Sequence, residues 1–211
     1  MKKTNILILL CIFISLFYWF LNPEGIGYYI VFRAANFLNG MVWTPVTALF
    51  VHANYIHLIG NMLFLYVFGN TLEDALGFRK MILAFFTGGI VSFVFSAFYY
   101  GFDVSMIGAS AAIFTLTSVV MLTKPLKFSW LFFMPLGLVA MLYFTFNLFA
   151  VYYSIQGNVG YISHVTGFLI GFPFGIAWSK NRWIKNLLIS IFLLILYGIT
   201  MFIIENLFVI Q

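Results

Sequence analysis

Charge is the scarcest property of this sequence. Only 7% of its 211 residues are charged, whereas 64% are hydrophobic. About a quarter of the residues of a soluble domain are charged, so this composition excludes an ordinary soluble protein. The single cysteine, Cys11, excludes an internal disulfide. An HExxH metal motif and a glycine-rich phosphate loop are also missing, so we expect no metal and no other cofactor.

Long hydrophobic runs dominate what is present. A helix needs roughly 17 to 25 apolar residues to cross the hydrocarbon core of a bilayer. The alternating ten-residue segments of a transmembrane barrel are not found in this sequence. We therefore predict an all-α membrane protein that forms one compact domain in the lipid bilayer. The seven expected spans cover about residues 5–21, 56–76, 81–100, 107–123, 128–151, 161–179 and 186–208.

The first run has a second interpretation, as a secretory signal peptide. Its apolar stretch is long, and no small-x-small cleavage site follows it. Leu10 stands where a lipoprotein site would need a small residue before Cys11. We therefore expect this run to be a membrane span.

Basic residues predict the orientation. Of the ten lysine and arginine residues, nine lie on one side of the seven-span arrangement and only Arg33 lies on the other. By the positive-inside rule, the side with the nine is cytoplasmic, so we expect the N-terminus inside and the C-terminus outside the cell membrane. This topology accounts for the net charge of +5, and no nucleic-acid partner is expected. The nine are Lys2, Lys3, Arg79, Lys80, Lys124, Lys127, Lys180, Arg182 and Lys185.

A long outer segment, residues 22–55, joins the first two spans. It is amphipathic and rich in aromatic residues, among them Trp43, which suits the membrane interface. A disordered loop would be far more polar. We therefore predict short helices that lie partly in the outer leaflet.

Polar side chains gather near the outer ends of three spans. His57 and Asn61 are four residues apart and share one face of the second span. Ser110 begins the fourth span and His164 begins the sixth. Ionisable residues inside a membrane are costly and indicate a functional site. The third histidine, His52, lies just before the second span.

The serine and the histidine have similar predicted depths. Ser110 lies 14 residues before Lys124, and His164 lies 16 residues before Lys180. At about 1.5 Å per residue, these separations are roughly 21 and 24 Å from the basic flank. In a core roughly 30 Å thick, both residues lie below the outer surface and nearly level with each other.

Small residues would allow the two helices to meet. Gly167 and Gly171 lie on the helix face that carries His164. Such a pair often serves close packing alone, and Ser110 is flanked by small residues that fit this interpretation too. The alternative is chemical, because a histidine can take the proton of a serine hydroxyl and make it a nucleophile. The missing carboxylate at this depth favours a Ser–His dyad over a triad.

These motifs resemble those of the rhomboid intramembrane serine proteases. HANYIHLIGNM (52–62) resembles the histidines and asparagine of the family's second core helix, and GAS (108–110) resembles the glycine-x-serine of the fourth. SHVTGFLIG (163–171) resembles the histidine and glycine of the sixth, and Trp43 resembles the tryptophan of the first loop. The resemblance implies a six-helix rhomboid-like core in residues 1–180 and one additional C-terminal transmembrane helix in 181–211.

The resemblance also implies roles for individual residues. Ser110 would be the nucleophile and His164 the general base and acid. His57, Asn61 and the Ser110 amide would stabilise the oxyanion. Substrates would be single-pass transmembrane proteins, cut near the outer face, and residues 152–161 would cap the site. The supporting residues would be His52, Gly108, Phe114 and Gly167.

Three departures from the family pattern leave other functions open. Ala111 follows the serine where glycine is common, Phe114 replaces a frequent tyrosine, and Thr44 replaces an arginine after the loop tryptophan. One alternative is a rhomboid-like protein that binds membrane helices without cutting them. A transporter or channel is a second, although its polar residues would extend through the full membrane depth. The sequence makes no prediction of the oligomeric state.

Overall fold

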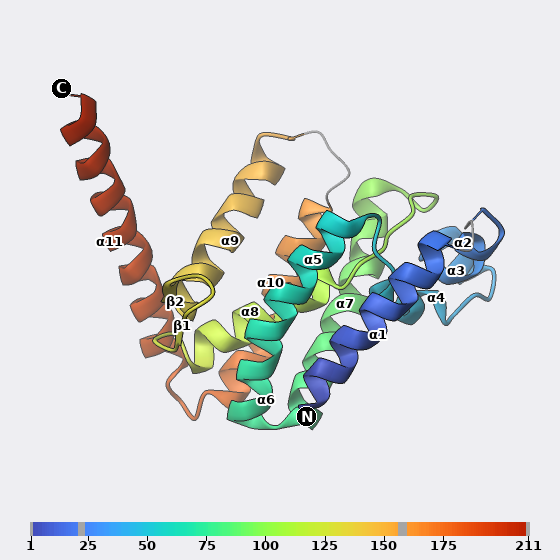
Figure 1. The fold of residues 1–211 in the computed structure, drawn as a ribbon, viewed down its shortest axis with the longest axis horizontal. Coiled ribbons are helices and arrows are strands. Elements are labelled where there is room, and N and C mark those ends of the chain that lie inside the picture. Colours follow the sequence, from blue (N-terminus) through green and yellow to red (C-terminus); the bar gives the residue numbers. More distant parts are fainter. Residues whose placement is uncertain (1, 21–23, 156–159, 210–211) are drawn as a thin grey trace.

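The protein is a bundle of membrane-length helices (Figure 1). This computed structural model describes residues 2–20, 24–155 and 160–209. Five helices are long and apolar enough to cross a membrane, and two shorter apolar helices accompany them. The all-α membrane fold is confirmed. The helices are α1 (Lys3–Phe20), α5 (Tyr55–Phe64) continued by η2 (Leu65–Gly69) and α6 (Asn70–Leu76), α7 (Phe78–Tyr100), α8 (Ser110–Thr123), α9 (Leu136–Tyr152), α10 (Tyr161–Trp178) and α11 (Trp183–Val209).

The fifth predicted span, residues 128–151, was wrong at its start. Its first residues form a small antiparallel hairpin of β1 (Phe128–Ser129) and β2 (Met134–Pro135), and the helix begins only at Leu136. A residue before proline is disfavoured in the helical region, so Pro135 prevents the helix from including Met134. Phe133 turns the chain with a φ of 53°. The other spans agree with helices to within three residues at each end.

Short helices fill the outer segment, as predicted. They are α2 (Glu24–Ile30), α3 (Ala34–Leu38), α4 (Thr44–Thr47) and the 3-10 turn η1 (Ala48–Phe50). Trp43 ties this segment together, because its indole N–H donates to the carbonyl of Tyr29 at 2.8 Å. The expected cap over residues 152–161 is described only in part, since residues 156–159 lie outside the described structure.

Helix α8 is the centre of the bundle. Its residues from Ala111 to Leu122 are all buried, and it packs against α7, α9 and α10. Its 14 residues are about 21 Å long, which is less than the roughly 30 Å of a hydrocarbon core. If the last residue of α8 lies at one face of such a core, the first residue lies below the opposite face.

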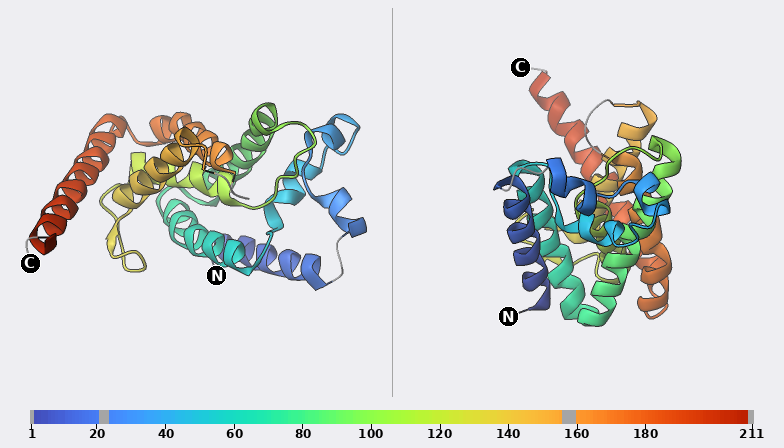
Figure 2. Two further views of the ribbon diagram at one scale, coloured as in Figure 1. Left: turned by 90° about the horizontal axis from the view of Figure 1, so that it is seen from above. Right: turned by 90° about the vertical axis from the view of Figure 1, so that its right-hand side faces the viewer.

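Helix α11 and the α2–α4 segment lie at opposite flanks of the bundle (Figure 2). Among the described residues of α11, the buried ones lie in its first part. Asn186 donates a hydrogen bond of 2.8 Å to the carbonyl of Leu122 on α8, and Ser190 is fully buried. Most of the remaining helix is exposed and apolar, which suits contact with lipid.

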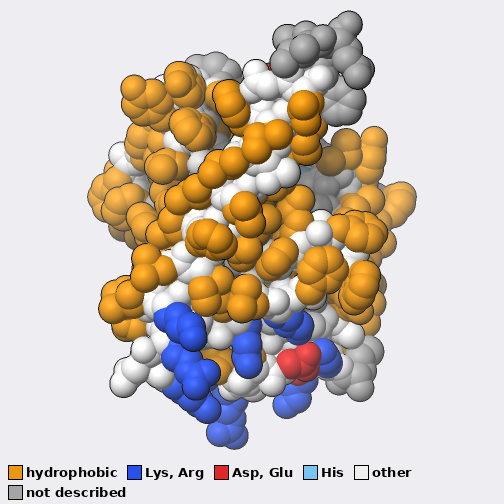
Figure 3. All heavy atoms as spheres, turned by 90° about the vertical axis from the view of Figure 1, so that its left-hand side faces the viewer, with side chains coloured by type: hydrophobic (Ala, Val, Ile, Leu, Met, Phe, Trp, Pro, Cys, Tyr) orange, Lys and Arg blue, Asp and Glu red, His pale blue; other side chains and the backbone are white. Residues whose placement is uncertain are grey.

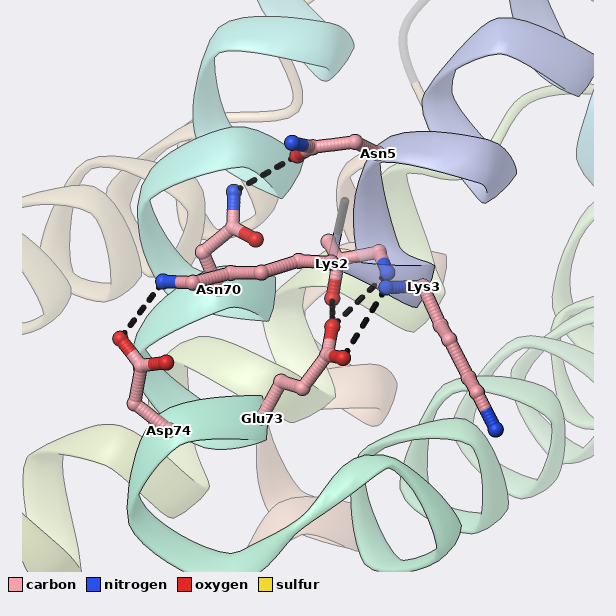
Figure 4. A network of polar contacts seen from close by, with 7 residues as sticks. Lys2, Lys3, Asn5, Asn70, Glu73 and Asp74 are labelled. Carbon is pink, nitrogen blue, oxygen red and sulfur yellow. Dashed lines mark hydrogen bonds and ion pairs between the residues drawn. The ribbon is translucent and has the colours of Figure 1, made fainter.

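The N-terminus is bound to the end of the second span. The Glu73 carboxylate accepts hydrogen bonds from the N–H groups of Lys3 at 3.0 Å and Thr4 at 2.8 Å, which satisfies donors at the start of α1 (Figure 4). Lys2 pairs with Asp74 at 2.7 Å. Lysine and arginine side chains gather at one end of the molecule below a broad hydrophobic face (Figure 3). This segregation agrees with the charge distribution expected for a membrane protein.

Candidate active site

Ser110 and His164 meet in the structure. Ser110 is the first residue of α8, and His164 lies in the first turn of α10. The His164 Nε2 lies 2.8 Å from the Ser110 Oγ, which is hydrogen-bonding distance. The histidine is 8% exposed, whereas the serine is partly open to solvent. The two residues thus share one contact at the start of α8.

Glycines on α10 permit this contact. A Cβ on Gly167 would collide with the carbonyl oxygen of Ala111, and a Cβ on Gly171 would lie 2.6 Å from the Cβ of Ser118. The Thr115 hydroxyl donates to the Gly167 carbonyl at 2.7 Å, which joins a side chain of α8 to the backbone of α10. The small residues on α10 therefore hold it against α8 at the depth of the serine.

Aromatic rings hold the imidazole from one side. Phe114, one turn after Ser110, stacks on His164 with a centroid distance of 4.6 Å and an interplanar angle of 12°. The ring of Tyr143 on α9 stacks in turn on the ring of Phe114, with a centroid distance of 4.6 Å. Phe114, which stands where the family frequently has tyrosine, therefore contacts the histidine through its ring alone.

Asn147 was missed by the sequence reasoning. Its Oδ1 lies 2.7 Å from the Nδ1 of His164, and the asparagine is only 2% exposed. A signal was available, because a carboxamide inside the apolar run of α9 is costly in a membrane. The predicted Ser–His dyad therefore lacked one contact. In the structure each ring nitrogen of His164 has a polar partner, Ser110 at Nε2 and Asn147 at Nδ1.

Donors surround Gly108, two residues before the serine. The Cε1–Nε2 edge of His57 faces Gly108 so closely that a Cβ there would lie 2.9 Å from Nε2. The Nδ1 of His57 lies 3.4 Å from the N–H of Ala53 and accepts from it, so Nε2 carries the proton of a neutral ring. The Asn61 Nδ2 is buried and has no hydrogen-bond partner among the described residues. The same amide nitrogen lies 3.5 Å from the Cβ position of Gly108.

The loop before Ser110 is held by backbone contacts. Phe32 and Met106 form an antiparallel bridge, and the Gly108 N–H donates to the Ala48 carbonyl at 2.9 Å. Gly108 has a φ of +105°, a conformation that favours glycine. The outer segment thus sets the position of the loop that leads into α8.

His52 contacts this loop at Ala109. The Ser15 hydroxyl donates to the Phe50 carbonyl at 3.1 Å and therefore accepts from the His52 Nδ1 at 3.0 Å. The His52 Nε2 then accepts from the N–H of Ala109 at 3.5 Å. Burial, with a smaller effect of His57, lowers the pKa of His52 to about 3, so the ring is neutral. With these contacts His52 lies beside the loop before Ser110, and its supporting role stays a prediction.

The start of α8 adds backbone donors that have no partner among the described residues. Ile113 is the first residue whose N–H bonds back to Ala109, so the N–H groups of Ser110, Ala111 and Ala112 precede the helical ladder. The helix dipole also favours negative charge at this end. An oxygen that gains charge beside Ser110 would therefore meet donors from the backbone and from side chains.

These features define a multi-pass helical membrane protein with a serine hydrogen-bonded to a histidine near one end of the bundle. The sequence model of the Rhomboid domain matches residues 39–181. The chain therefore belongs to the rhomboid family, and the resemblance drawn from the motifs is confirmed.

Curated relatives agree with this assignment. The chain is 23% identical over 181 residues to the rhomboid protease GlpG of Haemophilus influenzae, a match that covers 86% of this chain and 93% of that protein. It is 26% identical over 143 residues to Rhomboid-like protease 1 of Toxoplasma gondii, covering 67% of this chain and 49% of that one. The mitochondrial RHOMBOID-like protein 6 of Arabidopsis thaliana is 31% identical over 136 residues, or 63% and 42% of the two chains. The chain spans about half the length of the Toxoplasma relatives.

Proposed function

We propose that the protein is an intramembrane serine endopeptidase in which Ser110 is the nucleophile and His164 is the general base and acid. The observation that carries this proposal is the 2.8 Å contact between the Ser110 Oγ and the His164 Nε2. Membership of the rhomboid family supports it, as do relatives whose names include protease.

The contact between Ser110 and His164 supports an acyl-transfer reaction in which the histidine accepts and returns the proton. The Ser110 Oγ attacks the substrate carbonyl carbon while its proton passes to the His164 Nε2. The same proton then passes to the leaving amine as the peptide C–N bond breaks, which leaves an ester on Ser110. Water attacks the ester, gives one proton to His164 and releases the acid, and the proton returns to Ser110.

The oxyanion requires donors that are already in position. We assign this role to the His57 Nε2–H, the Asn61 Nδ2 and the N–H of Ser110. The unpartnered buried amide of Asn61 supports the assignment, because such a group is costly unless a ligand completes its bonding. Removing one donor of this kind typically lowers kcat by about 10²–10³-fold.

The substrates we propose are single-pass transmembrane proteins, cut near the outer end of their helix. The distribution of basic residues favours a cytoplasmic N-terminus, so we propose that the C-terminus and the opening of the site lie outside. A peptide bond inside a stable helix cannot reach Ser110, so the substrate helix must unwind locally. The cut would release the outer part of the substrate.

Covalent labelling tests the proposal directly. A fluorophosphonate reagent is expected to modify Ser110 in the folded protein, because only an activated hydroxyl reacts quickly. The adduct is mapped by mass spectrometry, and the rate should fall strongly in His164→Ala. Ser118, buried on the same helix, is the internal control and should stay unmodified. Folded protein that gives no Ser110 adduct would overturn the proposal.

Two glycine-to-alanine variants distinguish the effect of backbone strain from the effect of displacing the oxyanion donors. Gly108→Ala should lower kcat by about 10²-fold, because the new Cβ displaces the His57 edge as well as straining the backbone. Gly101→Ala is the matched control, since Gly101 has a φ of +103° but nothing within 4 Å of its Cβ position. Cleavage kinetics and thermal stability are measured for both. Equal loss of activity in the two variants would mean that strain alone is responsible.

A further inference from the structure

Helix α9 contributes a polar side chain to the histidine of the site. Asn147 lies about three turns into α9, and its Oδ1 is 2.7 Å from the Nδ1 of His164. The opposite ring nitrogen is 2.8 Å from the Ser110 Oγ. Three side chains from α8, α10 and α9 thus form one continuous chain of hydrogen bonds.

The orientation of the Asn147 amide follows from a second contact. Its Nδ2 donates to the carbonyl of Tyr143, one turn earlier on α9, at 2.8 Å. A carbonyl oxygen can only accept, so the NH₂ group must point to Tyr143. The Oδ1 must therefore point to His164, and it can accept a proton but not supply one.

This orientation selects one tautomer of the neutral imidazole. Because Asn147 offers an acceptor, the favoured ring carries its proton on Nδ1. The Nε2 then has a free lone pair, which is the state needed to accept the proton of Ser110. The opposite tautomer would leave two acceptors facing each other at 2.7 Å in a site from which water is largely excluded.

We propose that Asn147 is a positioning residue that holds His164 in the tautomer and orientation of a general base. The proposal rests on the proposed function of Ser110 and His164. When the ring takes the serine proton it becomes a cation, and its hydrogen bond to Asn147 becomes charge-assisted and stronger. Asn147 therefore contributes more to the transition state than to the resting protein.

The surroundings of Asn147 make the contact hard to replace. The asparagine is 2% exposed, so water cannot easily take its place. Tyr143, whose carbonyl orients the amide, also stacks through its ring on Phe114, which in turn stacks on His164. One turn of α9 thus fixes the imidazole through both its edge and its face.

Kinetics of three variants test the proposal. Asn147→Leu should lower kcat by about 10–100-fold with little change in KM, because one hydrogen bond that strengthens in the transition state is lost. Asn147→Asp keeps an oxygen facing Nδ1 and should recover most of this loss. Asn206→Leu is the matched control, since Asn206 makes the same amide contact, to Phe202 at 2.8 Å, on the exposed part of α11.

A spectroscopic readout separates positioning from a general structural role. In ¹⁵N-histidine-labelled protein, the His164 signals are assigned as those missing from His164→Gln. They should report a proton on Nδ1 in the wild type and a shift toward the Nε2-protonated form in Asn147→Leu. The Asn206→Leu spectrum should match the wild type.

The outcomes distinguish this proposal from the proposed function. Wild-type cleavage together with full activity and an unchanged tautomer in Asn147→Leu would overturn the role of Asn147 and leave the dyad intact. A wild type that never cleaves would remove the proposed function, while the tautomer measurement would still test the contact. Loss of activity with an unchanged tautomer would make Asn147 a packing residue only.

Discussion

Ser110→Ala is expected to lower the rate of substrate cleavage by about 10³-fold or more. The variant keeps the helix start and the neighbouring donors but has no oxygen to attack the carbonyl. Its fold should persist, because Ser110 is only partly buried and its side chain contacts His164 alone among the hydrogen-bonded groups described. The measurement is product formation from a model single-pass substrate in proteoliposomes.

His164→Ala should cost a similar factor, and the double variant should be no slower than either single one. When two residues act together in one catalytic step, removing either one already abolishes their contribution to the rate, so removing the second costs little more. Ser118→Ala is the control on the same helix. Its hydroxyl is buried without a partner among the described residues, so removing it should leave cleavage unchanged. Equal product from the wild type and Ser110→Ala would remove Ser110 as the nucleophile. Substrate that binds the wild type without yielding any product would instead favour a rhomboid-like binding protein.

The similar depth of these two residues was predicted from the sequence because it depends on distance along each helix. Their contact was one of two interpretations of the small residues. Counting from the basic flanks placed Ser110 and His164 at nearly the same depth, and glycines marked the face on which α10 could approach. The contact of 2.8 Å agrees with that reasoning. The depth of both residues in an actual bilayer stays a prediction.

The contribution of α9 could not be obtained in this way. Asn147 marks a polar position in α9, but whether it faces His164 depends on the rotation of the helix about its axis. The mostly apolar sequence of α9 carries no periodic pattern that would set this rotation. The start of the helix was misplaced for a related reason. Residues 128–135 are apolar enough to belong to a span, and only the local effect of Pro135 on Met134 separates hairpin from helix.

Gly167→Val is expected to lower both stability and cleavage, for one geometric reason. The added side chain meets the backbone carbonyl of Ala111, which cannot rotate away as a flexible side chain could. Helices α8 and α10 must separate, so the hydrogen bond of 2.7 Å from Thr115 to the Gly167 carbonyl is stretched. Overpacking of this kind costs about 1–3 kcal/mol of unfolding free energy.

Cleavage should fall further than stability in Gly167→Val. Separating the helices also separates Ser110 from His164, and a displacement of about 1 Å at a reacting pair can cost about 10²-fold in rate. Gly60→Ala is the control, because Gly60 lies in α5 with nothing within 4 Å of its Cβ position, and alanine there should be neutral or slightly stabilising. Both variants are compared by thermal unfolding in detergent and by cleavage of the same substrate. If Gly167→Val retained wild-type cleavage, close contact of α8 and α10 would not be what brings the serine and histidine together.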